Sequence, residues 1–128
     1  MIALDTNALV RLAVEDDKRQ SVAVRRLMAE ERTLILKTVL LETEWILRSR
    51  YAYQPKDTIE FFSFLAGLPN VSIEDRAAVE RAVAAIKKGM DFADALHAAS
   101  AGDTPLLTFD RSLVKRAKER FDVRLIDS

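Results

Sequence analysis

The chain has 128 residues, and 49% of them are hydrophobic, which is enough to build a core and predicts one compact domain over residues 1–128. The 20 lysines and arginines balance the 20 aspartates and glutamates, so no overall basic field attracts nucleic acid, and any such role must depend on local patches. The absence of cysteine excludes disulfides and thiolate metal sites. No apolar run approaches the ~18 residues that a membrane span needs, so a cytoplasmic location is the default expectation.

Short apolar runs alternate with longer stretches of helical periodicity along the chain. In the first half we expect a strand at 2–4, a short helix with Leu9, Leu12 and Ala13 on one face, a helix at 18–31, a strand at 34–36, a helix capped by Thr38 that runs to about Tyr51, and a helix at 56–65. In the second half we expect a strand at 71–73, helices at 74–88 and 92–101, a strand at 105–108, a basic helix at 110–121 and a strand at 123–126. This alternation predicts an α/β fold with a short, mostly parallel central sheet flanked by helices.

Two aspartates follow predicted strands at the edge where parallel sheets bind ligands. Asp5 ends the strand at 2–4, and Asp110 comes just after the strand at 105–108. Their matching positions predict a shared cleft. Aspartate is also a preferred helix N-cap, however, and both interpretations stay open for each residue.

The stretch TVLLETEWILRS contains two glutamates that lie about 200° apart around a helix, so they cannot share a face. Glu44 has Arg48 four residues later, which predicts an exposed ion pair. Glu42 lies among apolar neighbours and needs a partner, either an arginine or a metal ion; these neighbours are Val39, Trp45 and Ile46. We favour Glu42 as the functional residue and Glu44 as a surface salt bridge.

The stretch GMDFADALHAAS supplies a fourth acid, Asp94, three residues after Asp91. Asp91 could cap this helix, which would place Asp94 in the first turn among small apolar residues that allow close packing. The alternative is that Asp94 only complements the helix dipole, and this applies more strongly to Asp91. We expect His97, one turn further on, to be a packing residue rather than a general base.

Several carboxylates in one cleft repel one another, and a hard divalent cation removes that conflict. With no cysteine and one histidine, an oxygen-only site for Mg²⁺ or Mn²⁺ is favoured over a zinc site. Such a metal lowers the pKa of a bound water and polarises a phosphodiester, so phosphodiester hydrolysis is the reaction that this chemistry suggests.

The motifs LDTNAL, VLLETEW, DFADALHAA and LLTFDRSL, in this order, resemble those of the PIN-domain ribonucleases and, more narrowly, the VapC toxins of type II toxin–antitoxin pairs. The resemblance covers nearly the whole chain and implies a PIN-like fold and an endoribonuclease that uses Mg²⁺ or Mn²⁺. Its catalytic and metal-binding acids would be Asp5, Glu42, Asp94 and Asp110. It further implies supporting roles for Asn7 and Thr108, an RNA substrate, a homodimer, and a small VapB-like antitoxin that blocks the cleft.

Cations and aromatic residues near these acids are candidates for binding partners. We expect Arg111 and Lys115 to contact RNA phosphates because they adjoin Asp110, although a solvated helix face would explain them equally well. The three phenylalanines at 61, 62 and 64 cannot all face one side of a helix, so part of this cluster is expected in the core and the rest at a contact with another chain.

Two other enzyme or signalling classes and one non-enzymatic class compete with this hypothesis. A phosphoaspartate phosphatase would need a second acid where Asn7 stands, and a phosphate-receiver domain would need adjacent acids near the first strand and a lysine after a late strand. The remaining alternative is a catalytically inactive PIN-like RNA-binding or scaffold protein, which would typically lack one of the four acids.

Overall fold

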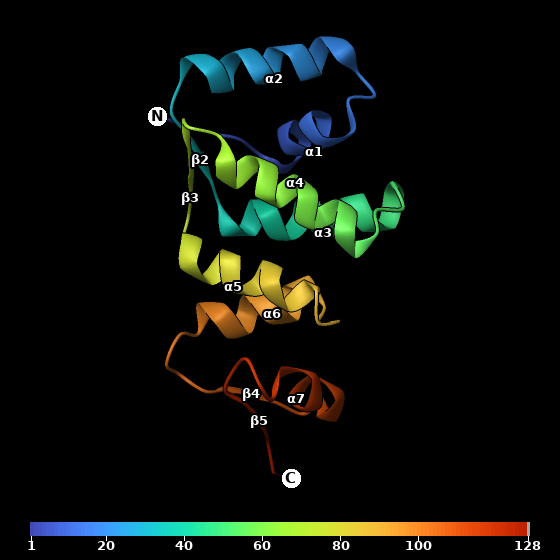
Figure 1. Ribbon diagram of the computed structural model, residues 1–128, viewed down its shortest axis with the longest axis vertical. Coiled ribbons are helices and arrows are strands. Elements are labelled where there is room, and N and C mark those ends of the chain that lie inside the picture. The colour runs from blue at the N-terminus through green and yellow to red at the C-terminus, as the bar shows by residue number, and fades with distance from the viewer. Residues whose placement is uncertain (128) are drawn as a thin grey trace. The chain divides into compact units, whose positions relative to one another are not determined.

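A computed structural model of the chain describes residues 1–127, in which short strands alternate with helices (Figure 1). The chain divides into two compact units, one of Met1–Glu74 and one that begins at Asp75, and each is described by itself. No helix in residues 1–127 is long and apolar enough to cross a membrane.

The first unit contains a three-stranded parallel sheet in the order β1-β2-β3. Its elements are β1 (Ile2–Ala3), α1 (Thr6–Val14), α2 (Lys18–Glu30), β2 (Thr33–Ile35), α3 (Lys37–Arg50), α4 (Pro55–Gly67) and β3 (Val71–Ile73). In the register of the sheet, Thr33 lies opposite both Ile2 and Val71. Because the strands are parallel, their carboxyl ends lie along one edge, and Asp5 and Glu74 follow β1 and β3 at that edge.

The N-terminus of α3 is capped by a residue distant in the sequence. Its N-cap position is Leu36, whose side chain makes no capping hydrogen bond, and the backbone N–H of Lys37 donates to Oε1 of Glu74 at 2.8 Å. The prediction that Thr38 caps this helix is therefore wrong. The helix begins one residue before Thr38, and its acceptor comes from the residue that follows β3.

The most deeply buried apolar side chains of the first unit are leucines and one isoleucine of its helices and its central strand. The helix α1 packs against α2 and α3, and α4 packs against β3 (Figure 1). The fully buried members of this core are Leu9, Ile35, Leu40, Leu47 and Leu65.

The phenylalanines of α4 divide between two environments, as their spacing predicts. Phe61 and Phe62 are buried with their ring centroids 6.1 Å apart, whereas Phe64 is 45% exposed. Participation of part of the cluster in the core is therefore confirmed, and the contact with another chain stays a prediction.

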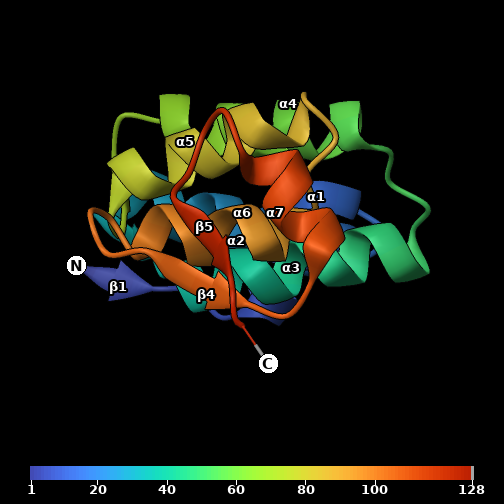
Figure 2. The same ribbon diagram turned by 90° about the horizontal axis from the view of Figure 1, so that it is seen from below.

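The second unit contains a helix pair and a two-stranded parallel sheet. Its elements are α5 (Arg76–Ile86), α6 (Phe92–Ser100), β4 (Leu106–Thr108), α7 (Arg111–Ala117) and β5 (Val123–Leu125). The pair α5 and α6 packs closely because the contact is rich in alanine, and Ala82, Ala85 and Ala95 are fully buried. The helix α7 packs on both strands of the sheet, which lie side by side in Figure 2.

The predicted α/β fold with parallel strands is confirmed, in a sheet of three strands and a sheet of two. The last helix is shorter than predicted and ends at Ala117 instead of Phe121. The carbonyl of Ala117 accepts from the N–H groups of both Arg120 and Phe121 at 2.9 Å, so the chain turns there before β5. That residues 1–128 form one domain stays a prediction.

Candidate active site

Asp5 stands at the carboxyl end of β1 and is the N-cap of α1. Its Oδ1 accepts a hydrogen bond from the backbone N–H of Ala8 at 3.0 Å, and its side chain is exposed. The capping interpretation is therefore correct for Asp5. It does not exclude metal binding, because an ionised carboxylate has lone pairs beyond the one that the cap uses.

Thr6 connects the start of α1 to Glu42 on α3. The side chain of Thr6 is buried, and its hydroxyl donates a hydrogen bond to Oε1 of Glu42. Since α1 and α3 pack against each other, this hydrogen bond holds the Glu42 carboxylate beside the first turn of α1.

Asp5 and Glu42 line the same cavity, which has a volume of about 460 Å³. Asn7 lines this cavity as well, as do two arginines and a tyrosine, namely Arg11, Arg50 and Tyr51. Carboxylate oxygens can bind a hard cation, and guanidinium groups can donate paired hydrogen bonds to a phosphate. The lining therefore has the chemistry to hold both a metal ion and an anionic substrate.

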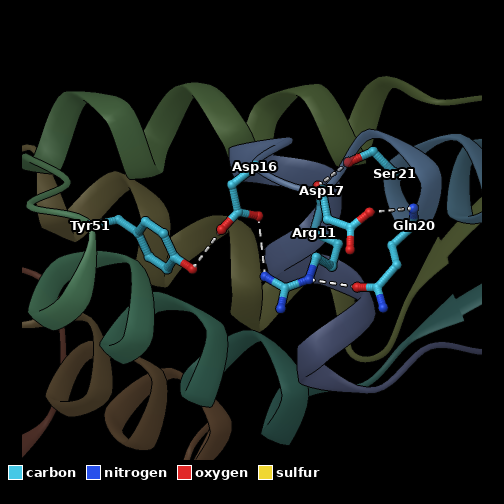
Figure 3. A network of polar contacts seen from close by, with 6 residues as sticks. All are labelled: Arg11, Asp16, Asp17, Gln20, Ser21 and Tyr51. Atoms are coloured by element: carbon cyan, nitrogen blue, oxygen red, sulfur yellow. Dashed lines mark hydrogen bonds and ion pairs between the residues drawn. The ribbon is translucent and has the colours of Figure 1, made fainter.

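The carboxylate of Asp16 fixes two of these lining residues from outside the cavity (Figure 3). Its Oδ1 pairs with Nη1 of Arg11 at 3.2 Å, and its Oδ2 accepts from the Tyr51 hydroxyl at 3.3 Å. The Nε of Arg11 also donates to Oε1 of Gln20 at 2.7 Å. The guanidinium group of Arg11 is thus held from two sides.

Tyr51 also lines a second cavity of the first unit, with a volume of about 470 Å³. Tyr53 and two acids, Asp57 and Glu60, line it too. Burial raises the pKa of Tyr53, and the negative charge of Asp57 raises it further, so the Tyr53 phenol stays neutral at physiological pH. Tyr51 therefore lines both cavities.

The environments of the two glutamates of α3 differ from the expectation. The predicted ion pair between Glu44 and Arg48 is present at 2.8 Å. The prediction that it lies on the surface is wrong for Glu44, whose side chain is only 8% exposed. Glu42 is exposed, and Trp45 beside it is 53% exposed. The buried face of α3 follows the spacing of Leu40, Thr43 and Leu47, which also carries Glu44 inward.

Asp94 lies in the first turn of α6, where its backbone N–H donates to Oδ2 of the N-cap Asp91 at 3.4 Å. Burial raises the pKa of Asp94 most, and the charge of Asp91 raises it further. The positive charges of Arg116 and His97 lower the pKa of Asp94, and the negative charge of Asp110 raises it. The charge of Asp110 therefore acts on the carboxyl group of Asp94. His97 is exposed, so the expectation of a packing role is wrong for this residue.

Asp110 is the N-cap of α7, just after β4. Its Oδ1 accepts from the backbone N–H of Leu113 at 3.1 Å, so the capping interpretation is correct here too. The backbone N–H of Asp110 donates to Oγ1 of Thr108 at 3.0 Å. Thr108 thereby fixes the backbone from which the Asp110 carboxylate extends.

The four acids therefore occur as two pairs, Asp5 with Glu42 in the first unit and Asp94 with Asp110 in the second. Over residues 1–127, neither unit gathers three or more histidine, aspartate or glutamate side chains in a group that could hold a metal ion. The donors present are carboxylate oxygens, which are the ligands that Mg²⁺ and Mn²⁺ prefer. The chemistry of the donor set thus fits a hard divalent cation.

Two residues of this cavity, Thr6 and Arg11, were missed in the sequence analysis. Thr6 could have been recognised only through its contact with Glu42, 36 positions away. Arg11 has a local signal, because it lies four residues after Asn7 and therefore on the same face of α1. Arg111 and Lys115, which we expected to bind substrate, are exposed and line a cavity of the second unit.

Comparison with known proteins identifies the family. The model of the PIN domain matches residues 2–119, so the chain belongs to the PIN domain family. No curated protein matches the chain. PIN domains are typically nucleases that depend on divalent metal ions.

Proposed function

We propose that this protein is a divalent-metal-dependent endoribonuclease that hydrolyses RNA phosphodiester bonds as the toxin of a type II toxin–antitoxin pair. The observation that carries the nuclease part is the cavity shared by Asp5 and Glu42 in a chain that belongs to the PIN family. Intact acids at all four motif positions favour an active enzyme over an inactive RNA-binding or scaffold protein.

The carboxylates of Asp5, Glu42, Asp94 and Asp110 would hold Mg²⁺ or Mn²⁺. When bound, such an ion lowers the pKa of a coordinated water and offsets the charge of the phosphodiester. The Thr6 hydroxyl keeps the Glu42 carboxylate in one orientation, which a metal ligand requires. Thr108 does the same for the backbone of Asp110.

Cationic side chains supply the attraction for the RNA backbone. Arg11 and Arg50 line the cavity of Asp5 and Glu42, so a phosphate beside these acids meets guanidinium donors. Asn7 adds an amide that can donate to a phosphate oxygen. In our proposal, Arg111 and Lys115 contact phosphates further along the strand.

The proposed partners are a second copy of the chain and a small VapB-like antitoxin that covers the site. This part of the proposal rests on the resemblance to the VapC toxins, and the 45% exposed ring of Phe64 is available for such a contact. Co-expression with the product of the neighbouring reading frame tests it. We expect the two proteins to co-purify and cleavage to be suppressed in the complex.

Cleavage of a labelled single-stranded RNA by the purified chain tests the nuclease proposal. We expect cleavage with Mg²⁺ or Mn²⁺ and none with excess chelator. The carboxylates and the RNA phosphodiester are both negatively charged, so a cation must offset their repulsion. Asp5→Asn is the control against a contaminating nuclease and should be inactive. Cleavage that persists in chelator would overturn the mechanism, and RNA binding without cleavage in Mg²⁺ would favour the inactive RNA-binding protein.

A further inference from the structure

A cavity of about 490 Å³ on the second unit combines cations with apolar walls. Its cations are Arg111, Lys115 and Lys118, which are spaced four and three residues apart. Lys118 keeps helical backbone angles as the C-cap of α7, so all three side chains follow one face of the helix. All three are exposed and can therefore meet a ligand from solvent.

The apolar part of the lining comes from the last turn of α7 and from β5. Val114, Phe121 and Leu125 line the cavity and are only partly buried, so each leaves apolar surface open to a ligand. The guanidinium of Arg81 lies 4.9 Å from the centroid of the Phe121 ring, and its Nη2 donates to the carbonyl of Arg120 at 3.1 Å. Arg81 thereby holds the ring in place.

The cavity keeps a positive balance although one acid lines it. Asp122 accepts hydrogen bonds from Nε and Nη2 of Arg124, both at 2.9 Å. This two-point contact compensates the charge of Asp122 from outside the lining. Arg111, Lys115 and Lys118 therefore give the cavity a net positive charge.

A ligand that satisfies this lining has a flat apolar part and negative charges beside it. We propose that the cavity is an accessory nucleotide subsite, in which Val114, Phe121 and Leu125 contact an unpaired RNA base while Lys115 and Lys118 contact the flanking phosphates. Base stacking on apolar and aromatic side chains combined with cations along the backbone is the usual mode of single-strand binding. The inference rests on the proposed RNA substrate.

The position of the cavity connects it with the proposed active site. Arg111 directly follows Asp110, one of the four acids, and a helix rise of ~1.5 Å per residue places Lys118 roughly 10 Å further along α7. An RNA strand that leaves Asp110 along this face of α7 therefore enters the cavity. The subsite would select an unpaired nucleotide at a fixed spacing from the cleaved bond.

Binding measured without metal separates this subsite from catalysis. Fluorescence anisotropy of the full chain in chelator would compare a labelled oligouridylate with a ribose-phosphate oligomer of equal length that carries no bases. The variants are Lys118→Gln and Leu125→Ser, and the control is Lys88→Gln, an exposed lysine of the same unit outside the cavity. Circular dichroism melts of each variant check that the unit remains folded.

We expect the wild type to prefer the base-bearing oligomer by about tenfold, the gain typical of one stacked base. Leu125→Ser should lose this preference and keep the salt dependence of binding. Lys118→Gln should weaken binding of both oligomers. It should also reduce the slope of log binding constant against log salt concentration by about 0.7, the value for one phosphate contact on a single strand. Lys88→Gln should match the wild type.

Equal affinity of the wild type for both oligomers would overturn the subsite, and so would equal effects of Lys118→Gln and Lys88→Gln. If either result accompanies metal-dependent RNA cleavage by the wild type, the subsite fails and the proposed function stands. If the wild type neither binds nor cleaves RNA, the proposed function fails and the subsite fails with it.

Discussion

The hydroxyl of Thr6 donates a hydrogen bond to the carboxylate of Glu42, and this contact joins the first residue of α1 to the middle of α3. Asp5 precedes Thr6 directly, so the two acids of the first unit are positioned by neighbouring residues of one short segment. A displacement of Thr6 would therefore change the positions of both carboxylates.

Thr6→Val keeps the shape of the buried side chain and removes only the donor. We expect a destabilisation of about 1 kcal/mol from the lost hydrogen bond. We also expect an approximately tenfold lower kcat/KM and weaker Mg²⁺ binding, because the oriented ligand is lost. Thr6→Ser, which keeps the donor, should restore most of the activity. A Thr6→Val enzyme with wild-type kinetics would contradict the positioning role.

Thr43→Val on α3 is the matched control for the loss of a threonine hydroxyl. Thr43 is fully buried, and its Oγ1 has no hydrogen-bond partner among residues 1–127. Removing an unsatisfied buried hydroxyl relieves a desolvation cost of about 1–3 kcal/mol. We expect chemical denaturation to show equal or higher stability and the cleavage rate to stay unchanged. A marked loss of stability would show that the hydroxyl is paired in solution.

Replacing each glutamate of α3 by glutamine tests whether Glu42 is a metal ligand and Glu44 a structural residue. Glu42→Gln keeps the acceptor for Thr6 but removes one ligand charge, so we expect a loss of cleavage of at least about a hundredfold with little change in stability. Glu44 is buried against Arg48, so Glu44→Gln should cost about 1–3 kcal/mol of unfolding free energy and leave the folded enzyme active. Kinetics paired with urea unfolding distinguish the two, and the reverse pattern would reassign the ligand.

Replacing Asp5 by asparagine or alanine distinguishes its role as the N-cap of α1 from its role as a metal ligand. Asparagine caps nearly as well as aspartate, so Asp5→Asn should be inactive yet melt no lower than the wild type in chelator. Asp5→Ala should be inactive and also lose about 1 kcal/mol. Mg²⁺ should raise the melting temperature of the wild type far more than that of either variant.

Asp17 provides the control for the position 5 variants. It caps α2 with the equivalent hydrogen bond, accepting from the N–H of Gln20 three residues later at 3.1 Å, and it does not line the cavity of Asp5 and Glu42. Asp17→Asn should therefore remain fully active. An active Asp5→Asn protein would return Asp5 to the role of a helix cap alone.

The raised pKa of Asp94 predicts a pH dependence of stability in the metal-free protein. Burial and the charge of Asp91 make the folded state hold this proton more tightly than the unfolded chain does. Stability should therefore fall as the pH rises from about 4, the ordinary value of an aspartate, through the raised pKa of Asp94. Asp94→Asn should melt higher than the wild type at pH 7 in chelator, and the difference should vanish as the pH falls below about 4. Melting curves over this range check it, with exposed Asp103→Asn as control.

Local signals predicted most of the fold, because strands and caps depend on nearby residues. The strand at 71–73, most of the strand predicted at 105–108, and the caps of Asp5, Asp91 and Asp110 follow from residue type and spacing. The cap of α3 could not be predicted in this way, since its acceptor is Glu74, 37 positions from Lys37. The burial of Glu44 was missed for a different reason, because Arg48 satisfies its charge at the edge of a buried face.

The same distinction applies to the candidate site. The motifs identify the acids, and the structure groups Asp5 with Glu42 around one cavity. Thr6 orients Glu42 through a contact across 36 positions that no local pattern encodes. Thr108 contacts Asp110 only two positions away, and the resemblance had already implied its supporting role.

The presence of Tyr51 in the lining of two cavities bears on inhibitor design. Tyr51 lines the cavity of Asp5 and Glu42 as well as the cavity of Tyr53, Asp57 and Glu60, and its hydroxyl donates a hydrogen bond to Asp16. A cationic aromatic compound suits the second cavity, where two carboxylates and aromatic rings surround it. Such a compound would contact Tyr51, which also lines the cavity of Asp5 and Glu42, without occupying the position of a metal ion. An inhibitor of this kind would not bind the metal ion. It would therefore differ from chelators, which also bind the metal ions of unrelated enzymes.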